Sequence, residues 1–183
     1  MKNQLFTAIK LSLACFILLV VIYPLAVLGI AQFTPNKGDV DFVKVRDKIV
    51  GVRQIGQSYT QAKYFWGRPS AVNYDAGVSG GSNKGPSNPD YIQTVQARRD
   101  TFLVHNPSVK ANEIPAELLT ASGSGLDPHI SLQSALVQIA RVAKARNHST
   151  EIIQKVVMNS LEKSPAGTPF VNVLELNLAL DRL

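Results

Sequence analysis

Among the residues of this chain, Gly123-Ser124-Gly125 comes nearest in type to a nucleophilic catalytic site. A serine in an esterase elbow needs a glycine two positions before it, and Ser122 stands there instead. Asp127 and His129 follow closely, but a catalytic triad depends on arrangement in space rather than on nearness in sequence. A turn therefore explains this stretch better than catalysis does, and a membrane-anchored serine hydrolase using Ser124 is the weakest of the alternatives.

A second glycine-rich run has part of the spacing of a phosphate-binding loop. Four residues separate Gly80 from Gly85, as in that loop, but the next residue must be lysine and is Pro86. Ser79-Gly80-Gly81 shares three residues with the signature of ABC transporters, a match short enough to occur often by chance. Glycines that serve tight turns are the better interpretation of this run.

Metal, disulfide and nucleic-acid chemistry find little support in the composition. The histidines at 105, 129 and 148 lack paired ligand spacing, and the one cysteine, Cys15, lies in an apolar run. The formal net charge is +6, without a basic stripe interleaved with aromatic residues, which makes nucleic acid a poor partner. The residues alone thus indicate an accessory or binding module rather than an enzyme.

Residues 11–31 form the stretch that organises the chain. No charge occurs between Leu11 and Asn36, and about 20 apolar helical residues cross a hydrocarbon core about 30 Å thick. Pro24 predicts a kink within this helix. The competing interpretation is a signal peptide cleaved after Gly29-Ile30-Ala31, but the apolar run exceeds the usual 7–15 residues.

The flanking charges predict the orientation of the helix. The first ten residues carry Lys2 and Lys10 and no acid, which favours a cytoplasmic N-terminus. We therefore expect a cytoplasmic tail over 1–10, a transmembrane helix over 11–31, a linker over 32–39 and a mixed α/β (α+β) extracytoplasmic domain over 40–183. These features describe a single-pass membrane protein.

Local patterns predict the elements of that domain. They are a β-hairpin from 40–45 and 49–55, a folded, contact-making loop over 67–90, a helix over 89–104 capped by Asn88, one helical turn within 115–120, a helix capped by Ser131, a helix capped by Ser149 or Thr150 through about 162, a turn over 165–169, a strand over 170–173 and a helix over 174–183. Residues 61–66 fit a short helix or a strand equally well.

Five sequence blocks resemble the C subunit family of the bacterial Kdp potassium-transporting ATPase. They are YFWGRPSA at 64–71, SGGSN at 79–83 with SNP at 87–89, TASGSGLDPHIS at 120–131, RVAKARN at 141–147 and VNVLELNLALD at 171–181. The resemblance implies contact or binding roles, with no catalytic residue and no metal ligand, for Tyr64, Arg68, Pro69, Ser79, Gly80, Gly81, Ser82, Asn83, Asn88, Ser122, Gly123, Ser124, Gly125, Asp127, His129, Arg141, Arg146, Asn172 and Asn177.

The resemblance also implies a location in the bacterial inner membrane, partners and a function. The expected partners are a channel-like potassium-binding subunit, a P-type ATPase subunit, a small single-helix subunit and the lipid bilayer. The family's C subunit is described as a catalytic chaperone that raises the ATP affinity of the ATPase subunit. ATP is suggested by that description only, and we expect no stably bound cofactor. The alternative role is a share in potassium passage at the pore mouth, through loop oxygens at 79–83 or 122–125.

Overall fold

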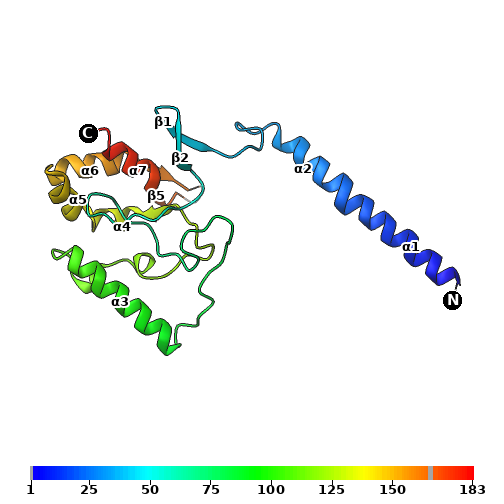
Figure 1. Ribbon diagram of the computed structural model, residues 1–183, viewed down its shortest axis with the longest axis horizontal. Helices are drawn as coiled ribbons and strands as arrows, with labels where there is room; N and C mark the ends of the chain where they lie inside the picture. Colours follow the sequence, from blue (N-terminus) through cyan, green and yellow to red (C-terminus); the bar gives the residue numbers. More distant parts are fainter. Residues whose placement is uncertain (1, 165–166) are drawn as a thin grey trace. The chain divides into compact units, whose positions relative to one another are not determined.

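The computed structural model describes residues 2–164 and 167–183. The chain divides into two units, residues 1–41 and 42–183, and each is described by itself. The first unit is a helix followed by a short turn-rich segment, and the second is a mixed helix and sheet module (Figure 1). The predicted fold class, one apolar N-terminal helix followed by an α+β domain, is therefore confirmed.

The first unit contains a continuous apolar helix from Asn3 to Ala31, long enough to cross a membrane. It comprises α1 (Lys2–Phe16), a π-helical segment η1 (Ile17–Ile22) and α2 (Tyr23–Ala31). The backbone N–H of Tyr23 donates to Leu18 O, a π-type bond just before Pro24. The helical hydrogen bonding thus changes locally just before Pro24, while the kink expected there stays a prediction.

The second unit begins with the predicted hairpin. Strands β1 (Phe42–Val45) and β2 (Lys48–Val52) pair antiparallel around a two-residue turn. Both turn residues, Arg46 and Asp47, have positive φ, at 48° and 63°. That is the conformation of a type I′ turn, whose twist matches that of the two strands.

A three-stranded antiparallel sheet of order β3-β5-β4 organises the rest of the module. Its strands are β3 (His129–Ser131), β4 (Leu161–Lys163) and β5 (Pro169–Asn172). The strand expected over 170–173 is confirmed as β5. The helix expected to reach about 162 was wrong at its end, because Leu161 leaves the helix to pair with Val171. The turn expected over 165–169 lies partly outside the described residues.

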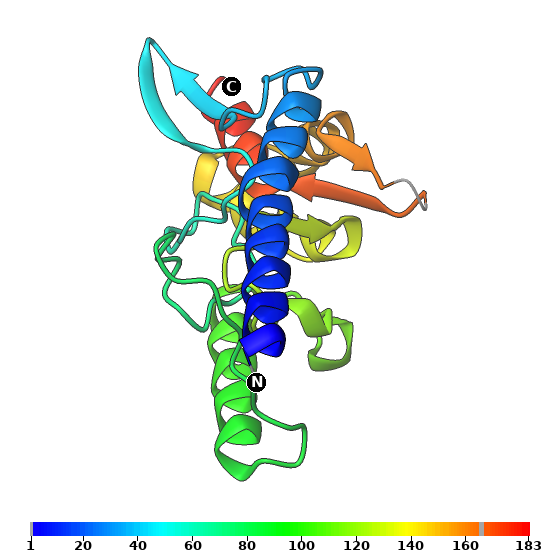
Figure 2. The same ribbon diagram turned by 90° about the vertical axis from the view of Figure 1, so that its right-hand side faces the viewer.

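The other regular elements of the described module are helices and short helical turns. They are α3 (Pro89–His105), α4 (Leu132–Leu136), α5 (Ile139–Arg146), α6 (Thr150–Asn159) and α7 (Val173–Leu180), with 3-10 turns η2 (Ala111–Glu113) and η3 (Ala116–Leu118). Within the module, α3 lies at the opposite end from α7 in both views (Figures 1 and 2). The single helix expected after Ser131 is interrupted at Val137 and Gln138.

One hydrophobic core joins these elements. Its fully buried members come from residues 64–66, which we call the aromatic segment, from the sheet and from the last helices. They include Phe65, Ile130, Val142, Ile153, Val157, Val171, Leu176 and Leu180. Segment 61–66, left undecided between helix and strand, forms turns and irregular backbone instead. Phe65 nevertheless enters the core, so the position of this segment must be fixed by side chains.

Candidate functional site

Two side-chain amides hold the backbone of Phe65 and Trp66. Asn177 Oδ1 accepts from Phe65 N–H at 2.8 Å, and Asn177 Nδ2 donates to Phe65 O at 3.0 Å. Gln138 repeats the arrangement on the next residue, accepting from Trp66 N–H at 2.8 Å and donating to Trp66 O at 3.1 Å. Both amides are almost fully buried. They take the place of neighbouring strands for a segment that belongs to no sheet.

Arg141 reinforces the same segment from α5. Its guanidinium donates to the carbonyl oxygens of Ala62 and Tyr64 at 2.6 and 2.9 Å. It also donates to the side-chain oxygens of Asn106 and Gln138 and lies 4.3 Å from the centre of the Trp66 ring. Burial lowers the pKa of Arg141 to about 10, which leaves it cationic at neutral pH. Neutral oxygens and the ring face thus stabilise this buried charge.

Arg146 and Tyr64 complete this scaffold at its more exposed edge. Arg146 donates to Asp181 Oδ1 at 2.7 Å and to the carbonyl oxygens of Lys63 and Leu180. The Tyr64 hydroxyl donates to the other oxygen of Asp181 at 3.0 Å. These predicted site residues therefore make intramolecular contacts that position the chain before Gly67.

Asn88 and Asn172 also have contacts of their own. Asn88 caps α3, since its side chain accepts from Tyr91 N–H, as its place before Pro89 predicted. Asn172 caps α7 by accepting from Glu175 N–H, and its Nδ2 donates to Arg53 O at 2.8 Å. These contacts give both residues structural roles within the module.

The two small-residue loops that the motifs singled out lie side by side. Gly80 N–H donates to Ser124 O at 2.9 Å, the Ser79 hydroxyl donates to the same oxygen at 3.2 Å, and Ser122 N–H donates to Pro69 O at 3.2 Å. We call residues 79–83 and 122–125 the paired loops. The expectation that residues 67–90 form contacts is therefore confirmed for the part that reaches Gly80.

Gly125 is the residue that lets the paired loops approach. Its φ is +69°, and a Cβ built on it would lie 2.7 Å from Gly80 O and 2.6 Å from a methyl group of Val72. Gly123, two residues earlier, has open space around the equivalent position. The exposed part of the paired loops consists of Ser79, Ser82, Asn83, Gly123 and Ser124.

An ion pair braces the base of the second loop. Arg68 donates to Asp127 Oδ2 at 3.0 Å, while Asp127 Oδ1 accepts from His129 N–H at 3.0 Å. Burial of the Asp127 carboxyl acts to raise its pKa, but the hydrogen bonds from His129 and then Arg68 outweigh it and lower the pKa below its usual value. The His129 ring lies 3.6 Å from Asp127 Oδ1 and against Phe170.

This geometry gives no support to hydrolysis by Ser124. Its hydroxyl oxygen accepts from Leu126 N–H at 3.1 Å, the bond of a local turn. His129, the nearest histidine in sequence, is engaged with Asp127 and Phe170. Within residues 2–164 and 167–183, no group of three or more His, Cys, Asp or Glu side chains gathers as a metal site would require.

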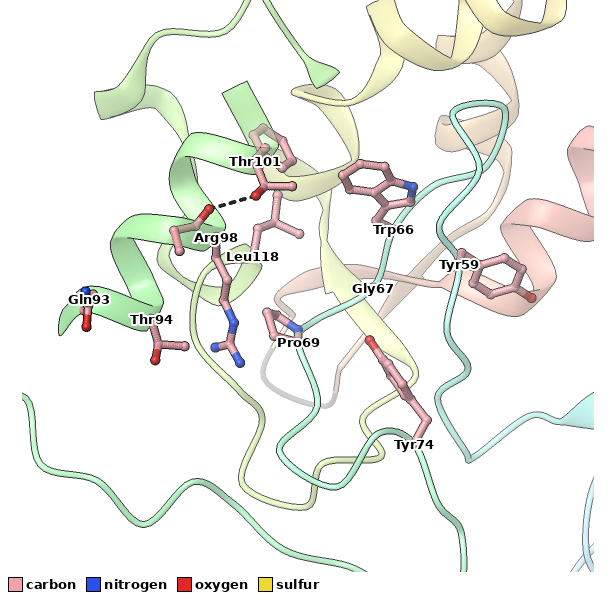
Figure 3. A pocket seen from close by; sticks show the side chains of 12 residues that line it. Tyr59, Trp66, Gly67, Pro69, Tyr74, Gln93, Thr94, Arg98, Thr101 and Leu118 are labelled. Atoms are coloured by element: carbon pink, nitrogen blue, oxygen red, sulfur yellow. Dashed lines mark hydrogen bonds between the residues drawn. The ribbon is translucent and has the colours of Figure 1, made fainter. Parts of the chain in front are cut away.

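A cavity of about 660 Å³ opens between α3 and the aromatic segment. Figure 3 shows Arg98 and Leu118 on the α3 side and Trp66, Pro69 and Tyr74 facing them. Arg98 also donates to Leu119 O at 3.0 Å. The Tyr74 hydroxyl donates to Arg68 O at 2.5 Å, and burial raises the pKa of that phenol.

The sequence interpretation missed the α3 side of this cavity. Its α3 residues include Thr94, Ala97, Arg98 and Thr101, which recur at helical spacing on one face. That spacing was the available signal. The stripe is mainly polar, so a search for apolar helix faces does not find it.

Together these features define a class of protein. An apolar helix with the length of a membrane span precedes an α+β module whose motif residues hold two adjoining loops and an aromatic segment in place. Across the described residues these groups form a scaffold rather than a set of reacting side chains. The class is a scaffold-like α+β module that follows a helix long and apolar enough to cross a membrane.

Comparison with known proteins identifies the family. The model of the K+-transporting ATPase c chain, KdpC, matches residues 5–182. The potassium-transporting ATPase KdpC subunits of Flavobacterium psychrophilum and Flavobacterium johnsoniae are 55% and 50% identical, each over all of both chains. That of Caldanaerobacter subterraneus is 43% identical over 98% of this chain and 95% of its own. The chain therefore belongs to the KdpC family, whose members are described as the c chain of K+-transporting ATPases.

Proposed function

We propose that this chain is a non-catalytic subunit that stabilises the assembled potassium importer by binding the channel-like subunit, the ATPase subunit and the small single-helix subunit. The observation that carries the proposal is the contact between the paired loops. The N–H of Gly80 donates a hydrogen bond to Ser124 O, which holds the two exposed loops against each other. A preformed surface of this kind binds a partner with little loss of conformational freedom. The apolar helix supplies the second contact, within the bilayer.

The module lies outside the cytoplasm in this proposal, with the N-terminus inside. The support is the basic, acid-free tail before the apolar helix. Protease added to intact spheroplasts should digest the module, and inverted membrane vesicles should protect it. Protection in spheroplasts together with digestion in inverted vesicles would overturn this orientation.

An effect on ATP affinity, if the module is outside, must be indirect. ATP is cytoplasmic, so the chain acts by binding the ATP-bound state of the complex better than the other states. Linkage is reciprocal: the factor by which the chain tightens ATP binding equals the factor by which ATP tightens binding of the chain. Titration of the other assembled subunits with this chain, with and without a non-hydrolysed ATP analogue, measures that factor. An affinity that ATP leaves unchanged refutes the coupling.

The docking role of the paired loops is tested by an exposed substitution. Ser82→Arg changes an exposed residue of the loop, and Met158→Arg changes an exposed residue of α6 as a control. We expect Ser82→Arg to reduce co-purification with the other subunits and potassium uptake, while Met158→Arg preserves both. Equal behaviour of the two variants would remove the paired loops from the interface.

A direct share in potassium passage has weaker support. Ser124 O, the oxygen most central to the paired loops, already accepts from Gly80 N–H and from the Ser79 hydroxyl. A carbonyl oxygen has two lone pairs, so both are occupied. Ser79→Ala removes one of these two hydrogen bonds and frees a lone pair of Ser124 O. An unchanged half-saturation value for potassium in that variant would refute a direct role in potassium passage.

A further inference from the structure

The β1–β2 hairpin carries an exposed face that combines apolar and basic side chains. Lys44 pairs with Ile49, and Phe42, two residues before Lys44, lies on the same face of the ladder. Phe42 is 49% exposed and Ile49 is 57% exposed. The turn beside it adds Arg46. Two large apolar side chains beside cationic ones make a surface suited to an interface between water and hydrocarbon.

The other face of the hairpin is the one that meets the module. A Cβ built on Gly51, which pairs with Val43, would lie 2.9 Å from a methyl group of the buried Leu174. Gln57 Nε2 donates to Val50 O at 3.2 Å and ties β2 to the following segment. Val43 and Val45 on this face are half-buried. Because one face is held in this way, the face of Phe42 and Ile49 is turned to the surroundings.

The tether to the apolar helix limits how far this face can travel. Residues 32–41 separate Ala31, the last residue of α2, from Phe42, the first of β1. An extended chain of about ten residues spans at most roughly 35 Å. A tether of this length allows the hairpin to reach the headgroup region beyond the hydrocarbon core.

The charge of the hairpin also matches a lipid surface. Its residues 42–52 contain Lys44, Arg46 and Lys48 against the single acid Asp47. Each basic side chain near an anionic membrane contributes about 1 kcal/mol of attraction. We propose that the hairpin rests on the bilayer, with Phe42 and Ile49 among the headgroups and the basic residues at lipid phosphates.

Spin labelling of the full chain in vesicles of phosphatidylcholine and phosphatidylglycerol tests this. Cys15 is the only cysteine, so Cys15→Ser gives a background for single labels. Labels at Phe42→Cys and Ile49→Cys are expected to be more accessible to oxygen than to a water-soluble nickel chelate. A label at Val104→Cys, at a highly exposed position on α3, is the aqueous control and should favour the chelate.

The proposal rests on the membrane anchoring proposed above, and a fourth label separates the two. A lipid-like signal at Val20→Cys with water-like signals at Phe42→Cys and Ile49→Cys overturns the hairpin contact alone. A water-like signal at Val20→Cys overturns the anchor. Water-like hairpin signals that become shielded only when the other subunits are added assign this face to a protein partner and likewise overturn the lipid contact.

The charge contribution has its own measurement. In the labelled Ile49→Cys background, Lys44→Gln should lower the ratio of membrane-bound to free hairpin roughly fivefold in vesicles rich in phosphatidylglycerol, the factor that corresponds to about 1 kcal/mol. Lys144→Gln, on α5, removes an equal charge elsewhere and should leave the ratio unchanged. An equal effect of both substitutions would indicate attraction by net charge rather than contact by the hairpin.

Discussion

The side chain of Asn177 and the backbone of Phe65 form a closed pair of hydrogen bonds, at 2.8 and 3.0 Å, across 112 positions of sequence. Both residues are buried, so neither backbone group has water as a substitute. This pair fixes where the aromatic segment turns towards the cavity and the paired loops. The stability of the module should therefore depend on it strongly.

Asn177→Ala leaves the N–H and C=O of Phe65 without partners in the core. Each unsatisfied buried group costs about 1–3 kcal/mol, so we expect a loss of roughly 2–4 kcal/mol in the free energy of unfolding. Denaturant titration of the detergent-solubilised chain measures it, with Asn112→Ala in the exposed turn η2 as control. A loss below about 1 kcal/mol would show that the pair contributes little.

Gly125→Ala should weaken the contact between the paired loops. The new Cβ would strain a left-handed backbone and press on Gly80 O, costing about 1–2 kcal/mol from the backbone alone. Gly123→Ala is the matched control, because nothing lies within 4 Å of its Cβ position. Thermal unfolding compares the two, and equal melting temperatures would contradict the close approach.

Arg141→Lys keeps the charge but loses the planar set of donors. A single ammonium cannot reach the oxygens of Asn106, Gln138 and Tyr64 together, so we expect a loss of about 2–4 kcal/mol. Trp66, the only tryptophan, stacks on this guanidinium, so its fluorescence should change as well. The exposed Arg99→Lys provides the comparison, and an unchanged Trp66 spectrum in Arg141→Lys would count against the stacking.

Acid should destabilise the module through Asp127. Its pKa in the folded state is lowered, so its contribution is full above the unfolded pKa of about 4 and is lost as pH falls through the folded value. Unfolding measured from about pH 6 downward should show a shallower loss of stability in Asp127→Asn than in the parent chain. Asp100→Asn, at an exposed ion pair, should follow the parent. Parallel curves for all three chains would exclude Asp127 as the source.

Local chemistry explains what could be predicted from the sequence. The apolar span follows from length alone, and the caps Asn88, Ser131 and Ser149 lie where the patterns placed them, because a cap involves neighbours three residues apart. The hairpin was likewise predictable, because its turn joins two adjacent runs of branched residues.

The features that could not be predicted from the sequence depend on contacts between distant segments. Leu161 continues the apolar pattern of α6 and becomes a strand only because Val171 pairs with it. Gln138 lies at a break between two helices, where its side chain accepts a hydrogen bond from the N–H of Trp66, 72 positions earlier. The cavity beside Arg98 exists only where α3 meets the aromatic segment. No window of local sequence contains these relationships.

The long sequence separations in the scaffold also set an order of events during synthesis. Residues 64–66 leave the ribosome early, yet Gln138 and Asn177 emerge much later, Asn177 close to the end of the chain. The module therefore cannot close around its aromatic segment until almost all of it has been made. A polypeptide passing through a translocation channel behind its apolar helix would stay unfolded, and so transportable, until the last helix had followed it across.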